Sequence, residues 1–141
     1  MDINRDDLLE AMLNRDIGYI ESLLALGLDP NYQFDGLLVE GWTLLRVATD
    51  IGEKNIIKLL LKNGADINKG DWTALHHAVD MAIDGTLQAG GPPGDEPTDM
   101  ILFLLNNGAN INIKDNKGET PIDIAKSYQS NKIVNLLEEY C

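Results

Sequence analysis

Two adjacent histidines and three carboxylates are the side chains of this sequence that could bind a metal ion or take part in catalysis. His76 and His77 stand side by side, and Asp80, Asp84 and Glu96 follow them. Imidazole nitrogens and carboxylate oxygens are zinc ligands, and a bound zinc ion can activate water for hydrolysis. The four-residue spacing from His76 to Asp80 would place both on one face of a helix. A metal-dependent hydrolase that uses His77 and Asp80 is therefore a remote alternative.

The features that usually complete a catalytic site are missing from the sequence. It contains no nucleophile–base–orienter set, no glycine loop of the kind that cradles phosphate, and no strong metal-ligand spacing. Its one cysteine, Cys141, is the last residue and has no evident base partner. We therefore expect no catalytic residues, no cofactor and no bound metal, and we interpret the chain as a binding module.

The elements that must position these side chains repeat along the sequence. A Leu-Leu pair before a glycine turn occurs in LLALGLDPN (23–31), LLKNGADIN (60–68) and LLNNGANIN (104–112). A second element, in which an alanine follows a threonine by five residues, recurs as WTLLRVA (42–48), WTALHHA (72–78) and ETPIDIA (119–125). The repetition predicts stacked units whose apolar faces only neighbouring units can cover.

Each unit is predicted to consist of a helix, a turn, a second helix and a loop. A threonine opens the first helix, where its hydroxyl can cap free backbone N–H groups. These threonines are Thr43, Thr73 and Thr120. Pro121 then occupies a first helical position, which needs no N–H. A glycine after each Leu-Leu pair supplies the positive φ that ends the second helix. The fold class is therefore all-α.

Three segments carry the motifs of a known family: TALHHA (73–78), TPIDIA (120–125) and NGADIN (63–68). With them the chain resembles the ankyrin repeat family over nearly its whole length. The resemblance implies an ankyrin-repeat solenoid, one domain of four stacked helix-turn-helix units with hairpin loops. The units are residues 5–39, 40–69, 70–115 and 116–141.

The resemblance also assigns individual positions. It implies that His76 is a structural histidine, whose imidazole bonds backbone near the hairpin. The second and fourth units carry Arg46 and Asp123 at this position, so its role is not uniform. Arg15 stands where the family usually has a glycine between the two helices, which makes the first unit atypical.

The stretch AIDGTLQAGGPPGDEPTD (82–99) contains an insertion of 14 residues between the two helices of the third unit. Apolar residues continue at helical spacing from Leu75 to Leu87, which predicts that the first helix extends to near Gln88. Gly90 and Gly91 are expected to end this helix. The next residues, Pro92, Pro93 and Gly94, would carry the chain round, and Pro97 would restart the second helix.

Charge and composition exclude several classes of partner. The net charge of −12 makes binding to nucleic acid or to an anionic membrane surface improbable, because both need a cationic face. The N-terminus does not resemble a signal peptide, and no segment has the roughly 20 apolar residues of a membrane span. A single cysteine fits a reducing, cytoplasmic setting. A basic partner protein remains compatible with the charge.

The partner-binding surface is predicted from two tryptophans and a row of polar residues. Trp42 and Trp72 each precede a motif threonine, a position that in ankyrin proteins faces the concave groove and commonly contacts partners. Packing against the adjacent hairpin is the alternative role. Asp50 and Asp80 hold equivalent positions in neighbouring units. His77, Asp80, Asp84 and Gln88 would line the polar face of the long helix, which could equally serve only for solubility.

A narrower hypothesis concerns the kind of partner. The inserted third unit, GDWTALHHAVDMAIDGTLQAGG (70–91), resembles small bacterial ankyrin proteins found beside toxin genes. That resemblance implies an immunity protein that occludes a cognate basic toxin. The chain itself is expected to be a monomer. A general scaffold and a host-directed effector are the alternatives.

Overall fold

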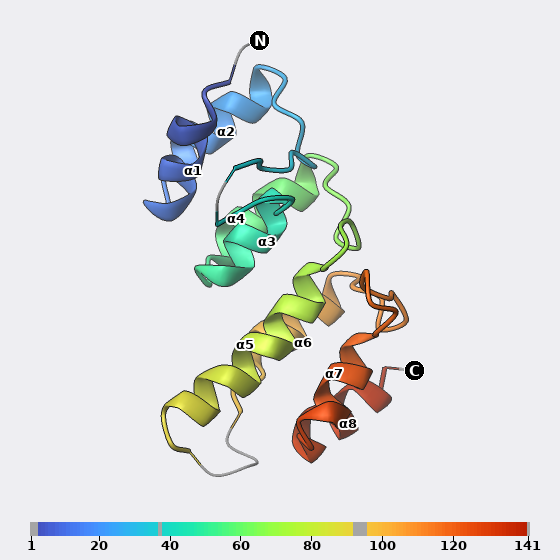
Figure 1. The fold of residues 1–141 in the computed structure, drawn as a ribbon. Helices are drawn as coiled ribbons and strands as arrows, with labels where there is room; N and C mark the ends of the chain where they lie inside the picture. Colours follow the sequence, from blue (N-terminus) through green and yellow to red (C-terminus); the bar gives the residue numbers. More distant parts are fainter. Residues whose placement is uncertain (1–2, 37, 92–95, 141) are drawn as a thin grey trace. The chain divides into compact units, whose positions relative to one another are not determined.

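The computed structural model describes residues 3–36, 38–91 and 96–140, which form eight α-helices and no extended strand. The helices are α1 (Arg5–Leu13), α2 (Ile17–Ala25), α3 (Leu44–Asp50), α4 (Lys54–Lys62), α5 (Ala74–Gln88), α6 (Asp99–Asn106), α7 (Pro121–Ser127) and α8 (Asn131–Glu138) (Figure 1). The predicted all-α class and the four helix pairs are confirmed.

The helix pairs belong to two compact units, residues 1–70 and 71–141. In the first unit α1 packs on α2 and α3 on α4, while α1 also contacts α3 and α2 contacts α4. In the second unit α5 packs on both α6 and α7, and α7 packs on α8. The boundary falls where the third repeat was predicted to start. That the whole chain forms one domain stays a prediction.

Threonine caps begin the first helix of three pairs, as predicted. Each hydroxyl accepts a hydrogen bond from the backbone N–H three residues later, at 3.1 Å for Thr43, 3.3 Å for Thr73 and 3.2 Å for Thr120. The bond satisfies one of the N–H groups that the first turn of a helix leaves without a partner. The sequence therefore fixes where these helices start through a local, residue-specific contact.

Asp123 completes the cap of α7 and has a shifted pKa. Its carboxylate accepts a hydrogen bond from the backbone N–H of Thr120 at 3.0 Å. That bond, a bond with the Thr120 side chain, and the charges of Lys126 and Lys114 hold the pKa of Asp123 below its ordinary value. Desolvation acts in the opposite direction but does not outweigh them. The cap is therefore strongest when Asp123 is ionised.

We expect the cap of α7 to weaken in acid. A lowered folded-state pKa gives stabilisation that is fully present above the ordinary pKa of about 4 and is lost as the pH falls through the lowered value. In Asp123→Asn the loss of folding stability in acid should be smaller than in the wild type. The difference should be at most about 0.5 kcal/mol, because Asp123 is exposed. An NMR titration of the carboxyl carbon measures the shift directly, and an ordinary pKa there would contradict the prediction.

Two helix-to-helix turns use a left-handed residue other than glycine. Arg15 lies between α1 and α2 with φ 57°, and Gln129 lies between α7 and α8 with the same value. Side chains with a Cβ atom are disfavoured in this region. Arg15 offsets the cost because its guanidinium donates to the carbonyl of Ile51, which caps the C-terminus of α3, at 2.8 Å. Arg15, which makes the first repeat atypical, thus links the two helix pairs of the first unit.

The inserted segment is helical as far as predicted. Helix α5 ends at Gln88, and Gly90 follows with φ 73°, in the left-handed conformation that stops a helix. The second helix of the pair, α6, begins at Asp99 with Thr98 at its N-cap, so Pro97 lies just before the helix. The predicted turn at residues 92–94 lies outside the described residues.

The long hairpin between α2 and α3 is folded back onto the first unit. Phe34 and Trp42 share a backbone hydrogen bond of 2.8 Å, and Phe34 is only 2% exposed. Arg5 donates from Nε to the carbonyl of Asp35 at 2.6 Å, which ties the hairpin to α1. Near the tip, Leu38 has φ 77° and is 94% exposed. One buried aromatic residue therefore anchors a loop whose tip faces water.

Candidate functional site

His76 holds the second unit together rather than a metal. Its Nε2 lies 2.8 Å from the carbonyl oxygen of Glu119, and its Nδ1 lies 2.7 Å from the hydroxyl of Thr73. A carbonyl oxygen can only accept, so Nε2 carries the proton and Nδ1 accepts from the hydroxyl. The imidazole is fully buried. The structural role implied for His76 is confirmed, because it joins the cap of α5 to the loop before α7.

His77 does not lie on the exposed face predicted for it, and that expectation is wrong. Its side chain is 7% exposed, and every residue from 74 to 79 is buried. The residues of the first turns of α5 are thus buried, and the polar face begins only at Asp80. Among the described residues, no three His, Cys, Asp or Glu side chains gather closely enough to hold a metal ion. The geometry therefore gives no support to the hydrolase that would use His77 and Asp80.

The outer face of α5 is part polar and part apolar. Asp80 is half-buried, and Asp84 is exposed and accepts a hydrogen bond from Gln88 at 2.6 Å. Leu87, the last residue of the predicted apolar series, is 58% exposed instead of buried. The added turns of α5 therefore carry carboxylates together with an uncovered apolar side chain.

Both tryptophans stack on the residue four positions later in their own repeat. The guanidinium of Arg46 lies 3.9 Å from the centre of a Trp42 ring, a cation–π contact. The Trp72 and His76 rings lie 5.3 Å apart and are tilted by 34°. Both tryptophans are half-buried. Each therefore has a packing role within its repeat, and contact with a partner stays a prediction.

The predicted contact residues divide between the two compact units. Trp42 and Asp50 belong to the first unit, and Asp50 is exposed at the end of α3. The other four, Trp72, His77, Asp80 and Asp84, belong to the second. The expected proximity of Asp50 to Asp80 stays a prediction, as does the use of these residues in binding.

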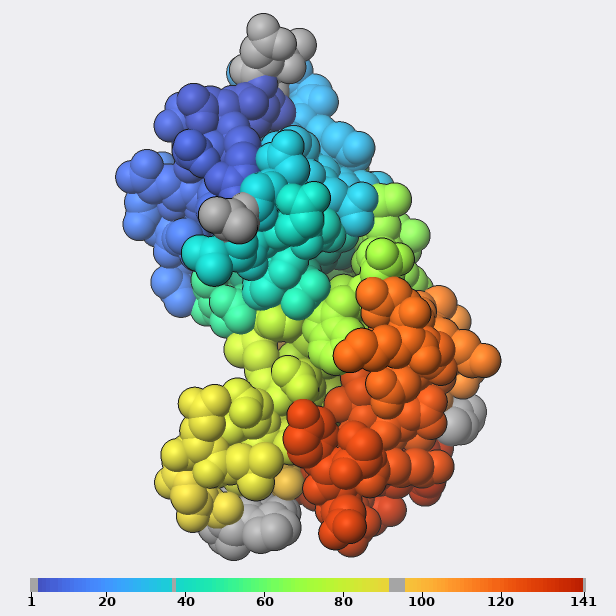
Figure 2. Space-filling view, viewed as in Figure 1, coloured from blue at the N-terminus to red at the C-terminus, as the bar shows by residue number. Residues whose placement is uncertain are grey.

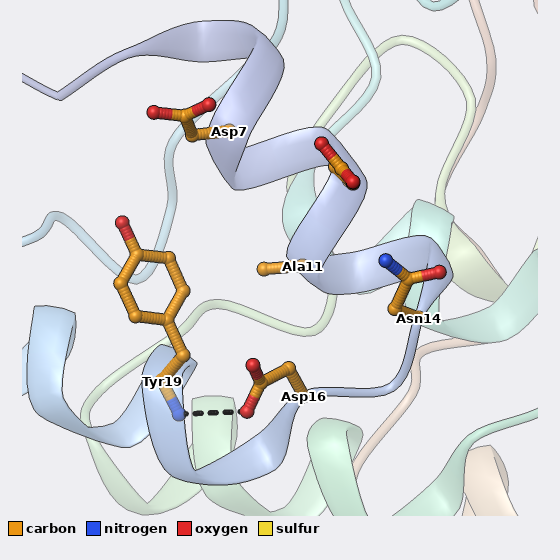
Figure 3. A pocket seen from close by; sticks show the side chains of 6 residues that line it. Asp7, Ala11, Asn14, Asp16 and Tyr19 are labelled. Carbon is orange, nitrogen blue, oxygen red and sulfur yellow. Dashed lines mark hydrogen bonds between the residues drawn. The ribbon is translucent and has the colours of Figure 1, made fainter.

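An acidic groove, which sequence reasoning missed, lies between α1 and α2. It has a volume of about 290 Å³ and is lined by Asp7, Glu10, Ala11, Asn14, Asp16 and Tyr19. The ring of Tyr19 stands beside α1, and the Ala11 methyl faces the same hollow (Figure 3). Asp16 accepts a hydrogen bond from the Tyr19 backbone N–H at 3.1 Å. Only the packing of the two helices brings these acids around one hollow, so no motif in the sequence marks it.

Comparison with known families identifies the repeats. A model described as ankyrin repeats, in three copies, matches residues 8–88, and a model of the single ankyrin repeat matches residues 70–116. The second match covers the third helix pair together with its insertion. The two matches cover the motifs of the first three predicted units, while the TPIDIA motif (120–125) lies beyond them.

Two curated relatives are named as putative ankyrin repeat proteins. A putative ankyrin repeat protein of fowlpox virus (strain NVSL) is 35% identical over 82% of the chain, and a second one is 30% identical over 96%. The chain spans 23% and 48% of the lengths of these two proteins. A probable 26S proteasome regulatory subunit, p28, of Saccharomyces cerevisiae is 30% identical over 69% of the chain and 39% of its own length.

Proposed function

The chain belongs to the ankyrin repeat family, and on this premise we propose that it binds a partner protein with a basic surface. Ankyrin repeats are protein–protein interaction modules and are generally not enzymes. The acidic groove between α1 and α2 is the main support for a basic partner, because three of its six lining residues are carboxylates. The net charge of −12 supports the same assignment.

The proposed contact surface uses residues from each unit. In the first unit, Trp42 and Arg46 form a stacked pair of the residue types that are enriched among interface hot spots. In the second unit, Asp80 and Asp84 lie on the outer face of α5. Acidic residues at such positions mainly accelerate the encounter with a cationic partner, and added salt screens them. Trp72 and Asp50 complete the proposed surface, and His77 is omitted because it is buried.

A narrower form of the proposal is that the chain acts as a monomer in the cytoplasm and occludes a basic toxin, as an immunity protein does. The acidic surfaces support it because many toxins that attack nucleic acid must carry basic ones. A general scaffold or a host-directed effector would bind a partner without protecting the cell from it. No helix among the described residues is both long and apolar enough to cross a membrane.

Capture of the partner from the source cell tests the proposal. We expect the tagged chain to retain a protein with a basic surface, and we expect Trp42→Ala to weaken binding about thirtyfold, the effect of losing one hot spot of about 2 kcal/mol. The double variant Asp80→Lys/Asp84→Lys should slow association and reduce its dependence on salt. Titration calorimetry and stopped-flow kinetics with the purified partner measure both effects.

A matched control uses two other acids of the second unit, both of them exposed. Glu138→Lys/Glu139→Lys makes the same change in net charge at the end of α8 and should leave association nearly unchanged. Equal behaviour of the two double variants would show that only total charge matters and would contradict the proposed surface. An acidic captured partner would contradict the proposal itself. Protection of cells that co-express the captured protein separates the immunity role from the scaffold role.

A further inference from the structure

A second pocket lies in the second unit, beneath the added turns of α5. It has a volume of about 320 Å³, and its described lining residues are Ile83, Thr86, Leu87, Gly91, Glu96, Tyr128, Gln129 and Asn131. These residues come from the end of α5, the inserted segment, and the turn between α7 and α8. Figure 2 shows the yellow end of α5 facing the red and orange atoms of α7 and α8 across a hollow. The pocket exists because α5 is 15 residues long and α7 only 7.

The walls of this pocket are apolar and uncovered. Leu87 is 58% exposed and Tyr128 is 52% exposed, while Ile83 behind them is buried. Large apolar side chains in water favour any ligand that covers them. The phenol ring of Tyr128 also presents a π face, on which a planar cation can stack. The walls are therefore suited to a ligand that is partly apolar and partly cationic.

The polar lining of the pocket includes one acidic side chain, Glu96. Glu96 is 4% exposed and lines the pocket, as do Gln129 and Asn131. The ammonium of Lys132 donates to the backbone carbonyl of Glu96 at 3.0 Å, which ties Glu96 to α8. No lysine or arginine is among the described lining residues. Residues 71–141 carry eleven acidic residues and four lysines, so the surrounding potential also favours a cation.

We propose that this pocket binds an arginine side chain presented by the partner protein. The aliphatic stem of the arginine would lie against Ile83 and Leu87, its guanidinium plane would stack on Tyr128, and its N–H donors would face Glu96. Arginine fits better than lysine because its planar group both stacks on a ring and donates several hydrogen bonds to a carboxylate. The volume lies at the small end of the range for ligand pockets, which suits one side chain. The assignment rests on the proposed binding of a basic protein and adds the residue that is recognised.

Binding of N-acetyl-arginine amide, followed by NMR amide shifts of the full chain, tests the pocket without the partner. We expect saturable shifts centred on Leu87, Gly91 and Tyr128, with a dissociation constant of about 1 mM, as befits a ligand the size of one residue. N-acetyl-citrulline amide has nearly the same shape and no charge, and should bind about tenfold more weakly. Equal binding of the two ligands would overturn the proposal, as would shifts centred on the groove between α1 and α2.

Two variants locate the binding, and one matched variant controls for side effects. Tyr128→Ala should weaken the arginine ligand at least fivefold, because the stacking face is lost. Glu96→Gln should do the same through loss of charge. Tyr140→Ala removes another exposed tyrosine of this unit, outside the pocket lining, and should leave binding unchanged. Because Tyr128 is exposed, its variant stays informative even where Glu96→Gln fails to fold. Unchanged binding in Tyr128→Ala would refute the assignment.

The two proposals fail separately. A basic partner that binds the Tyr128→Ala variant as tightly as the wild type, with no arginine binding in the pocket, would refute the arginine site alone. Arginine binding in the pocket without any basic partner would refute the proposed function and leave only the affinity of the pocket for arginine.

Discussion

Replacement of Phe34 with alanine is expected to lower the free energy of unfolding of the first unit by about 3–5 kcal/mol. The Phe34 side chain is 2% exposed, and its ring meets that of Tyr32 edge to face at 5.1 Å. Its backbone N–H donates to Trp42, and its carbonyl accepts from Gly41, so the ring is held where the hairpin closes. The variant therefore leaves a cavity and also loosens the hairpin.

Urea unfolding followed by circular dichroism measures this loss, and hydrogen exchange of residues 3–36 assigns it to the first unit. Leu38→Gly is the matched control in the same hairpin. Because Leu38 is exposed and has a positive φ, this change should leave stability unchanged or raise it by up to about 1 kcal/mol. Similar losses in Phe34→Ala and Leu38→Gly would show that the hairpin is not anchored by its aromatic residue.

The second large effect is expected at His76. His76→Phe keeps most of the side-chain volume but removes the bonds to Thr73 and to the carbonyl of Glu119. The Glu119 carbonyl keeps its bond from the backbone N–H of Asp115 at 2.8 Å, but both hydrogen bonds of a fully buried imidazole are lost. We expect a loss of about 1–3 kcal/mol, because each of the two lost hydrogen bonds contributes about 0.5–1.5 kcal/mol.

Asp123→Asn serves as the control for His76→Phe, since Asp123 holds the same position in α7. Asp123 is exposed, and asparagine can still accept the hydrogen bond from Thr120, so this change should cost less than about 1 kcal/mol at neutral pH. Thermal unfolding compares the two variants. Faster amide exchange at residues 115–120 in His76→Phe would locate its effect in the loop before α7. A loss no greater than that of Asp123→Asn would contradict the role given to His76.

Local signals in the sequence predicted the helices well. The cap residues Thr43, Thr73 and Thr120 act within three residues, and the end of α5 at Gln88 followed from helical spacing and the glycines after it. Such features depend on interactions between near neighbours in the chain, so the residue types alone determine them. The structural role of His76 came from the family resemblance, since its partner Glu119 lies 43 residues away.

Surface assignments were less predictable because they depend on which elements cover a side chain. His77 was expected on an exposed face and is buried, whereas Leu87 was expected in an apolar series and is exposed. Helical period gives the direction of a side chain on its own helix but not the extent of the neighbouring helix. Helix α7 is short, so it leaves Leu87 near the end of α5 uncovered. The same difference in length between α5 and α7 creates the pocket at Tyr128, and no sequence motif predicts this pocket.

The length of α5 also limits how the inserted segment can vary. Helix α5 is eight residues longer than α3, an excess of about 12 Å or a little over two helical turns. Removing one residue from this excess would rotate every later side chain by about 100°, which would carry Leu87 away from Tyr128. Removing a whole turn would preserve the direction and shorten the reach by about 5 Å. Viable length variants of this segment should therefore differ by three or four residues at a time, so that recognition changes in steps rather than gradually.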